Sequence, residues 1–219
     1  MSEVREDMPG VRVTPDAAKP AGTLTVAIDP ATTSGWAAFV DGQLTESGFF
    51  RVTTPALAFR LLLRLAKANA GREKRIVVED QYLHAPTPGE GVDAKEAVNN
   101  AAMRFRGTAK VVRIHGWFES AGVICGYEYE SALSQQWQGP LGVATLAKLR
   151  YNGDRKKASR EISKSRYHRD FSSDESDAIL LGSWYEVERK RVLATVVVSG
   201  RKKAAKAEPS SDQQMSLLR

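Results

Sequence analysis

The chain has 219 residues, of which 42% are hydrophobic and 26% charged, and this composition is typical of one globular domain with short extensions. Its net charge of +6 fits a polyanionic partner without requiring one, and no apolar run approaches the roughly 18 residues of a membrane-spanning helix. The polar N-terminus lacks the apolar centre of a signal peptide, and the single cysteine, Cys125, excludes an internal disulfide and a cysteine-based zinc cluster, which indicates a reducing, intracellular compartment.

The first half of the chain predicts an antiparallel meander, then a helix and a buried strand. The polar, proline-bearing residues 1–22 are expected to form a disordered arm. Asp41-Gly42 is a strong hairpin signal, because glycine adopts positive φ at little cost. Thr54-Pro55 is typical of a helix start, and Gly71 of a helix end. The predicted elements are strands at 23–28, 36–40 and 44–50, a helix at 56–70 and a strand at 75–79.

The second half predicts mainly helices. Asp93 and Glu96 have the spacing of a capping box ahead of a helix that reaches about Arg106. The β-branched residues 192–198 are compatible with an edge strand or another element. The remaining predicted elements are a strand at 110–114, a helix at 115–127, a loose stretch at 135–142, a basic helix at 154–167, a helix at 173–191 and a disordered tail at 199–219. This order predicts an α/β domain at 23–198, with a mixed sheet, antiparallel leading strands and helices on both faces.

Two carboxylates end apolar strands. Asp29 closes the first strand, and Glu79 closes the run 75–79. A side chain at the carboxyl end of a strand in an open α/β sheet faces the crevice where ligands bind. A buried carboxylate is costly unless it is solvated, paired or bound to a metal. For each residue alone, a turn aspartate before Pro30 or a strand that emerges into solvent explains the pattern equally simply.

A second acidic pair begins the helix at 173–191. Asp174 and Asp177 are three residues apart, so they share one helical face, although acidic first turns also occur only as caps. A functional role is favoured because this pair occurs in the same chain as the strand-terminal Asp29 and Glu79. Four carboxylates from distant positions match the oxygen ligands that Mg²⁺ prefers. Two such ions are the standard device for phosphodiester hydrolysis.

Three acidic blocks, taken in order, resemble the RuvC family of Holliday-junction resolvases. They are Ala27-Ile28-Asp29-Pro30 with Ser34-Gly35-Trp36-Ala37, Val77-Val78-Glu79-Asp80-Gln81-Tyr82, and Asp174-Glu175-Ser176-Asp177-Ala178. The resemblance runs from about Thr23 to Arg189. It implies an RNase H-like fold, a homodimer, and paired, symmetric nicking of four-way DNA junctions. It also implies two Mg²⁺ ions per active site, with Mn²⁺ able to substitute, and no small-molecule cofactor.

The resemblance also implies roles for particular residues. Asp29, Glu79, Asp174 and Asp177 would be the metal ligands and catalytic acids. Tyr82 matches an aromatic residue near the junction centre, where it would stack on a base, although a core tyrosine is an equal alternative. Lys157, or Lys156 if the alignment shifts by one residue, matches a lysine near the active site. The basic segment directly before the acidic pair would hold phosphates through Arg155, Lys156, Lys157, Arg160 and Lys164.

The chain departs from the family pattern at both ends and in residues 84–95 and 127–145. These differences suggest a phage-type or otherwise diverged member that acts in the cytoplasm of a bacterial or phage-infected cell. Three alternatives stay open: a relaxed branched-DNA nuclease, an RNA–DNA hybrid nuclease, and a noncatalytic junction-binding protein. Preference for a hybrid would require recognition of a 2′-hydroxyl group.

Overall fold

The computed structural model describes residues 22–80 and 94–207, which form a five-stranded sheet with the strand order β3-β2-β1-β4-β5. The meander comprises β1 (Thr23–Asp29), β2 (Thr33–Val40) and β3 (Gln43–Arg51), which pair antiparallel. On the other side of β1, β4 (Glu73–Asp80) and then β5 (Glu128–Leu133) pair parallel. The predicted α/β fold with antiparallel leading strands is confirmed.

Local signals position the turns of this first half as predicted. Asp41 and Gly42 join β2 to β3 with φ values of 54° and 83°, the left-handed conformation that the hairpin requires. The helix α1 (Pro55–Ala68) begins with its proline after an extended Thr54. The chain then turns through Gly71, with φ at 82°, into β4.

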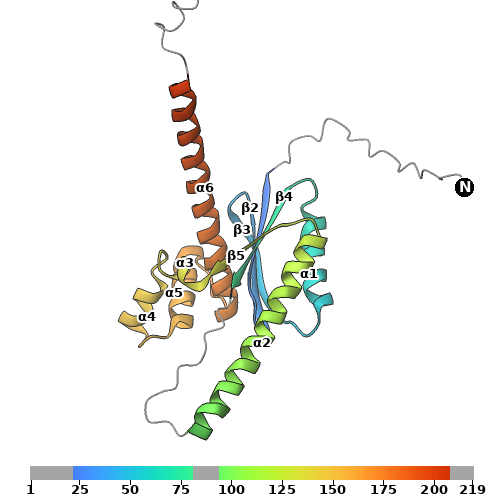
Figure 1. Ribbon diagram of the computed structural model, residues 1–219, viewed down its shortest axis with the longest axis vertical. Coiled ribbons are helices and arrows are strands. Elements are labelled where there is room, and N and C mark those ends of the chain that lie inside the picture. The colour runs from blue at the N-terminus through green and yellow to red at the C-terminus, as the bar shows by residue number, and fades with distance from the viewer. Residues whose placement is uncertain (1–21, 81–93, 208–219) are drawn as a thin grey trace, which may run out of the picture.

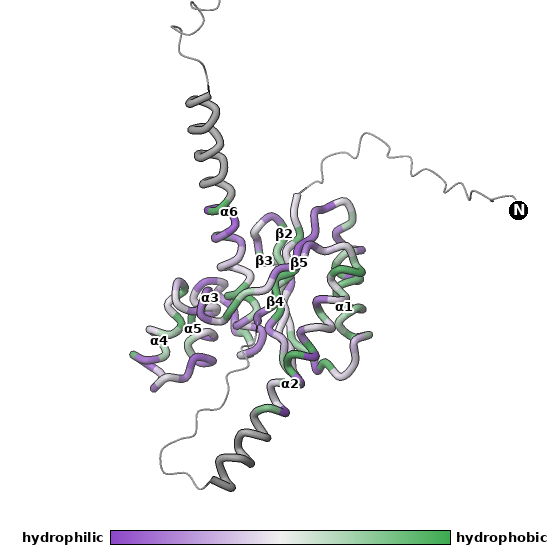
Figure 2. Tube along the Cα trace, viewed as in Figure 1, coloured by the Kyte–Doolittle hydropathy of each residue, from purple (hydrophilic) through white to green (hydrophobic). Residues whose placement is uncertain are grey.

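Helices cover both faces of the sheet (Figure 1). One face carries α1 and α2 (Ala94–Ile124), and the other carries the remaining helices. The side-chain alternation of β1 explains the two cores, because Val26 and Ile28 pack with the α1–α2 layer while Ala27 packs with α6. Figure 2 shows the hydrophobic colour running through the central strands between these layers. The helices of the second layer are α3 (Ser134–Gln138), α4 (Val143–Arg150), α5 (Arg155–Tyr167) and α6 (Ser173–Ala207).

The strand predicted at 110–114 is wrong, because these residues lie within the continuous helix α2. The local run is rich in β-branched residues, but tertiary packing overrides that preference. Ile114, Phe118 and Ala121 are buried together against the sheet, and their spacing of four and three residues is helical. One longer helix therefore replaces the predicted strand and the helices on either side of it.

Several other elements differ from the prediction. The edge strand β5 has only one buried residue, Ala132, so it lacks the apolar run expected of a strand. The stretch at 135–142, predicted to be loose, includes most of the short helix α3, and α4 follows it. The helix α6 continues beyond 191 through 192–198 and reaches Ala207, so the first part of the predicted disordered tail is helical. The arm at 1–21, the cap at Asp93 and residues 208–219 lie outside the described residues.

No helix in 22–80 or 94–207 has an apolar stretch of the length that crossing a membrane requires.

Candidate functional site

The parallel pairing of β1 and β4 brings Asp29 and Glu79 to the same end of the sheet. The ladder aligns Ile28 with Val78, and the two acids follow directly on neighbouring strands. Both side chains lie on the face that α6 covers, because they share the alternation of the buried Ala27 and Val77. Asp29 is 6% exposed and Glu79 is 5% exposed. Two strand-terminal carboxylates are therefore buried side by side.

The start of α6 delivers the second acidic pair to the same place. Asp29 pairs with Gly35 in the β1–β2 ladder, and Gly35 lies directly under Asp174. A β-carbon on Gly35 would lie 1.8 Å from the carbonyl oxygen of Asp174, so only glycine allows this approach. Asp177 follows three residues later and is 8% exposed. The structure thus brings together all four acids that the sequence predicted.

Lys156, near the start of α5, places its ammonium group among these carboxylates. Its Nζ atom lies 2.8 Å from Oδ1 of Asp174, 3.0 Å from Oδ2 of Asp177 and 3.6 Å from Oδ2 of Asp29. Lys157 lies instead 3.6 Å from Asp154. Of the two lysines that the sequence offered, Lys156 is therefore the one that contacts the acids.

Burial and mutual repulsion shape the protonation of this cluster. Burial raises the pKa of Asp29 well above its ordinary value of 3.8, and the neighbouring Glu79 raises it further. Burial also raises the pKa of Glu79 and of Asp177. Burial lowers the pKa of Lys156, but Asp29 and Asp177 outweigh this effect and keep its pKa above the ordinary 10.5. When ionised, the acids carry more negative charge than one ammonium neutralises.

The donor set fits a hard divalent cation in its chemistry. All four side chains offer carboxylate oxygens, the ligands that Mg²⁺ prefers, and the burial of Asp29, Glu79 and Asp177 makes additional positive charge favourable. Within residues 22–80 and 94–207, no three or more acidic, histidine or cysteine side chains are so placed that they could hold a metal ion as they stand. The Lys156 ammonium lies where those carboxylates converge, so it acts as their counterion in this arrangement.

This charge balance predicts how pH changes the stability of the metal-free protein. Because Asp29, Glu79 and Asp177 have raised pKa values, the folded protein binds more protons than the unfolded chain above about pH 4. The free energy of unfolding contributed by these groups therefore falls as the pH rises from their ordinary values through the raised ones. Urea unfolding in EDTA should show wild type losing stability relative to Asp177→Asn over this interval. A difference that does not change with pH would contradict the raised pKa values.

Two supporting groups were missed by the sequence analysis. The hydroxyl of Ser134 donates a hydrogen bond to Glu79, and Ser134 is the first residue of α3, a segment without a local helical signal. Glu175 is also buried, and its carboxylate accepts hydrogen bonds from Ser47 on β3 at 2.7 Å and from the backbone of Ser172 at 3.3 Å. The spacing Ser172-x-x-Glu175 is that of a capping box and could have been recognised.

Replacing Glu175 with alanine should lower the free energy of unfolding by about 1–2 kcal/mol, because it removes a helix cap and leaves Ser47 without its acceptor. The loss should be visible in urea unfolding. The half-exposed Glu188, which pairs with Arg191 one turn along α6, offers a matched alanine control with little expected effect. Equal stability of the two variants would contradict a supporting role for Glu175.

The basic residues predicted for DNA lie on or beside α5, which forms as predicted. Lys157, Arg160 and Lys164 line an open cleft of about 360 Å³ together with Tyr151 and Phe171. Arg155 donates a hydrogen bond to Gln138 at 3.0 Å, and Lys164 pairs with Asp170 at 2.8 Å. Tyr82 lies outside the described residues. The contact of Tyr82 and of the basic residues of α5 with DNA stays a prediction.

Comparison with solved structures identifies the fold as the RNase H-like α/β fold of RuvC. A structure of RuvC from T. thermophilus in complex with a Holliday junction substrate aligns with a TM-score of 0.50 and 14% identity, covering 76% of this chain and 96% of that one. A second T. thermophilus RuvC structure aligns over the same shares with a TM-score of 0.49 and 13% identity. No protein-family model matches this chain, nor does any curated protein sequence. The resemblance that the acidic blocks predicted is confirmed at the level of the fold.

Proposed function

We propose that this protein is a metal-dependent endonuclease that resolves four-way DNA junctions by paired, symmetric nicking. The observation that carries the proposal is the convergence of Asp29, Glu79, Asp174 and Asp177, from three distant segments, at one end of a RuvC-like sheet. A chain without catalytic function has no reason to retain like charges that burial makes costly. The likeness to a structure of RuvC with its junction supports branched DNA as the substrate class.

The residues of the chain have distinct roles in this proposal. The four carboxylates would hold two Mg²⁺ ions, or Mn²⁺ in their place. The chemistry supplied by the bound ions is activation of water and neutralisation of the leaving oxygen. Ser134 orients the carboxylate of Glu79, and the capping box at Glu175 fixes the helix start that carries Asp174 and Asp177. Before metal binds, the ammonium group of Lys156 neutralises part of the carboxylate charge, and it would have to move away when the ions bind.

The substrate would be held by the basic face beside these acids. Arg155, Lys157, Arg160 and Lys164 would contact phosphates, which contribute most of the sequence-independent affinity for DNA. Tyr82 would stack on a base near the junction centre. Symmetric cutting requires two active sites related by a two-fold axis, so we propose a homodimer. The compartment that fits is the cytoplasm of a bacterial or phage-infected cell.

A substrate panel tests this function. Purified protein is mixed with a labelled immobile four-way junction, a matched linear duplex, and an RNA–DNA hybrid of the same sequence, each with and without Mg²⁺. Paired, Mg²⁺-dependent nicks confined to the junction are expected. Preferred cutting of the RNA strand would favour a hybrid nuclease instead, and junction binding without cutting in any divalent metal would leave a noncatalytic binding protein.

A further inference from the structure

A second cationic cleft lies on the opposite face of the sheet from the carboxylates. It has a volume of about 190 Å³ and lies between the end of β3 and the middle of α2. Its charged side chains come from two elements, with Arg51 ending β3 and Lys110 and Arg113 one turn apart on α2. Thr32, Thr53 and Trp117 also line it, together with the apolar Val52 and Ile114.

The positive charge of this cleft is not balanced internally. Arg51, Lys110 and Arg113 form no ion pair with any carboxylate whose side chain the structure describes. By contrast, Lys157 and Lys164 of α5 both have acidic partners. Three cations that converge on one cleft repel one another, and an anion between them relieves that repulsion. The cleft also offers two threonine residues, whose hydroxyl groups bind phosphate oxygens well.

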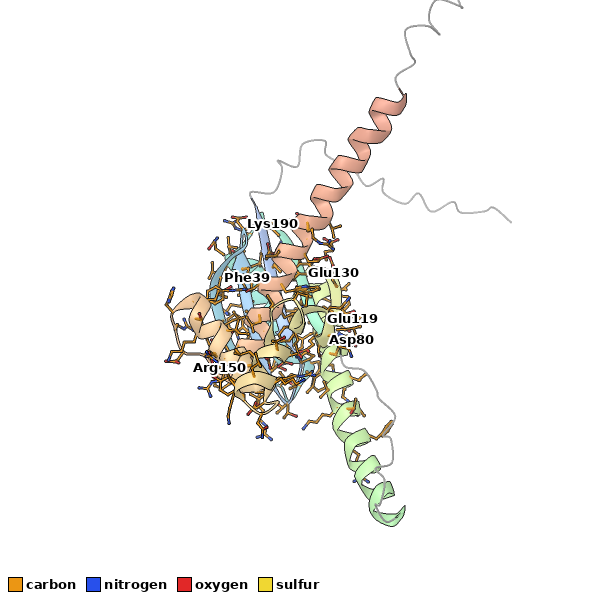
Figure 3. All side chains as sticks on the ribbon, turned by 90° about the vertical axis from the view of Figure 1, so that its left-hand side faces the viewer. Phe39, Asp80, Glu119, Glu130, Arg150 and Lys190 are labelled. Carbon is orange, nitrogen blue, oxygen red and sulfur yellow. The ribbon has the colours of Figure 1, made fainter. Side chains whose placement is uncertain are left out.

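The position of the cleft connects it with the acidic site. Thr33 pairs with Arg51 across β2 and β3, and the amide of Val52 donates to the carbonyl oxygen of Thr32 at 2.9 Å. Thr32 lies only three residues after Asp29, so the cleft and the acids share one end of the sheet. Figure 3 shows α2 on one flank of the molecule, near Asp80, and Arg150 at the end of α4 on the other. The cleft residues on β3 and α2 and the basic residues of α5 therefore lie on opposite faces of the sheet, at the end where the carboxylates converge.

We infer that the cleft formed by Arg51, Lys110 and Arg113 is a second phosphate-binding site, which holds the DNA backbone on the α2 side while α5 holds it on the other. This inference rests on the proposed function, because it names where the same substrate makes further contact. A nucleic acid suits the cleft better than a small anion, since it is long enough to reach both flanks at once. The two contacts would hold a strand across the carboxylates between them.

The test measures how salt weakens binding. The double variant Lys110→Gln/Arg113→Gln is compared with wild type and with Arg60→Gln/Lys67→Gln, which removes the same charge from exposed positions of α1. Affinity for an immobile four-way junction is measured by fluorescence anisotropy, without Mg²⁺, over a series of salt concentrations. Each lost phosphate contact lowers the slope of log K against log salt by about 0.9. We expect the cleft variant to lose about two contacts and the α1 control to keep the wild-type slope.

The outcomes separate this inference from the function on which it rests. If wild type binds and cuts the junction while the cleft variant keeps the slope of the α1 control, the second phosphate site is wrong and the nuclease proposal stands. If wild type neither binds nor cuts the junction, both the proposed function and the second phosphate-binding site are wrong. A reduced slope with an unchanged melting temperature supports the second phosphate-binding site. The melting temperature should not change, because all four replaced side chains are exposed.

Discussion

Replacing Asp29 with asparagine is expected to slow Mg²⁺-dependent cleavage of a four-way junction by about a thousandfold or more, while junction binding without metal persists. Asp29 ends β1 at the centre of the acidic cluster, where Lys156, Glu79 and Asp177 all act on its charge. Asparagine keeps the shape but removes a negative ligand, so the cluster would hold divalent metal weakly. A thousandfold loss corresponds to about 4 kcal/mol of transition-state stabilisation. Single-turnover cleavage of a labelled junction measures the effect.

Asp41→Asn is the matched control for this experiment. Asp41 lies in the β2–β3 turn at the opposite end of the sheet, and asparagine tolerates its positive φ of 54°. The control loses an exposed ion pair with Arg72, which contributes little to stability. It should cleave at the wild-type rate. If Asp29→Asn cleaves as fast as Asp41→Asn, Asp29 is not part of the catalytic centre.

The second large effect is expected at Lys156. Replacing it with methionine should lower the free energy of unfolding of the metal-free protein by about 1–2 kcal/mol, because buried carboxylates lose their counterion. The value lies below the full cost of breaking a buried pair because the Lys156 side chain is 52% exposed. Mg²⁺ should then stabilise the variant more than it stabilises wild type, because no ammonium competes for the carboxylates. Thermal unfolding in EDTA and in Mg²⁺ measures both effects.

Lys157→Met controls for the loss of a basic residue from α5. Its side chain is 65% exposed and pairs with Asp154 rather than with the acidic cluster. Its metal-free stability and its response to Mg²⁺ should match those of wild type. A larger gain from Mg²⁺ in Lys157→Met than in Lys156→Met would reverse the assignment of the two lysines.

The acidic residues could be predicted from the sequence because they stand out against strong local patterns. Asp29 and Glu79 end buried apolar runs, and Asp174 and Asp177 share one helical face. Which of Lys156 and Lys157 faces the acids could not be predicted. Neighbouring helical residues point about 100° apart, so the rotation of α5 about its axis (its phase) decides between them. Asp154, which caps α5 by accepting from the amide of Lys157, sets that phase.

The elements that sequence reasoning missed are those whose local pattern is weak or misleading. The β-branched run before Ile114 favours a strand, but the helical spacing of Ile114, Phe118 and Ala121 against the sheet prevails. The edge strand β5 buries only Ala132 and depends on its pairing with β4. Ser134 reaches Glu79 only because β5 and α3 meet at that point, and no local motif encodes such a contact.

The central claim is that the four converging carboxylates hold divalent metal ions, and direct binding of Mn²⁺ tests it independently of cleavage. Free Mn²⁺ is titrated against wild-type protein and the Asp29→Asn/Asp177→Asn variant and is followed by electron paramagnetic resonance. Two bound ions per wild-type chain, with binding lost in the double variant, are predicted. Wild-type protein that binds no more Mn²⁺ than the double variant would contradict the claim and leave Lys156 as the permanent partner of these acids.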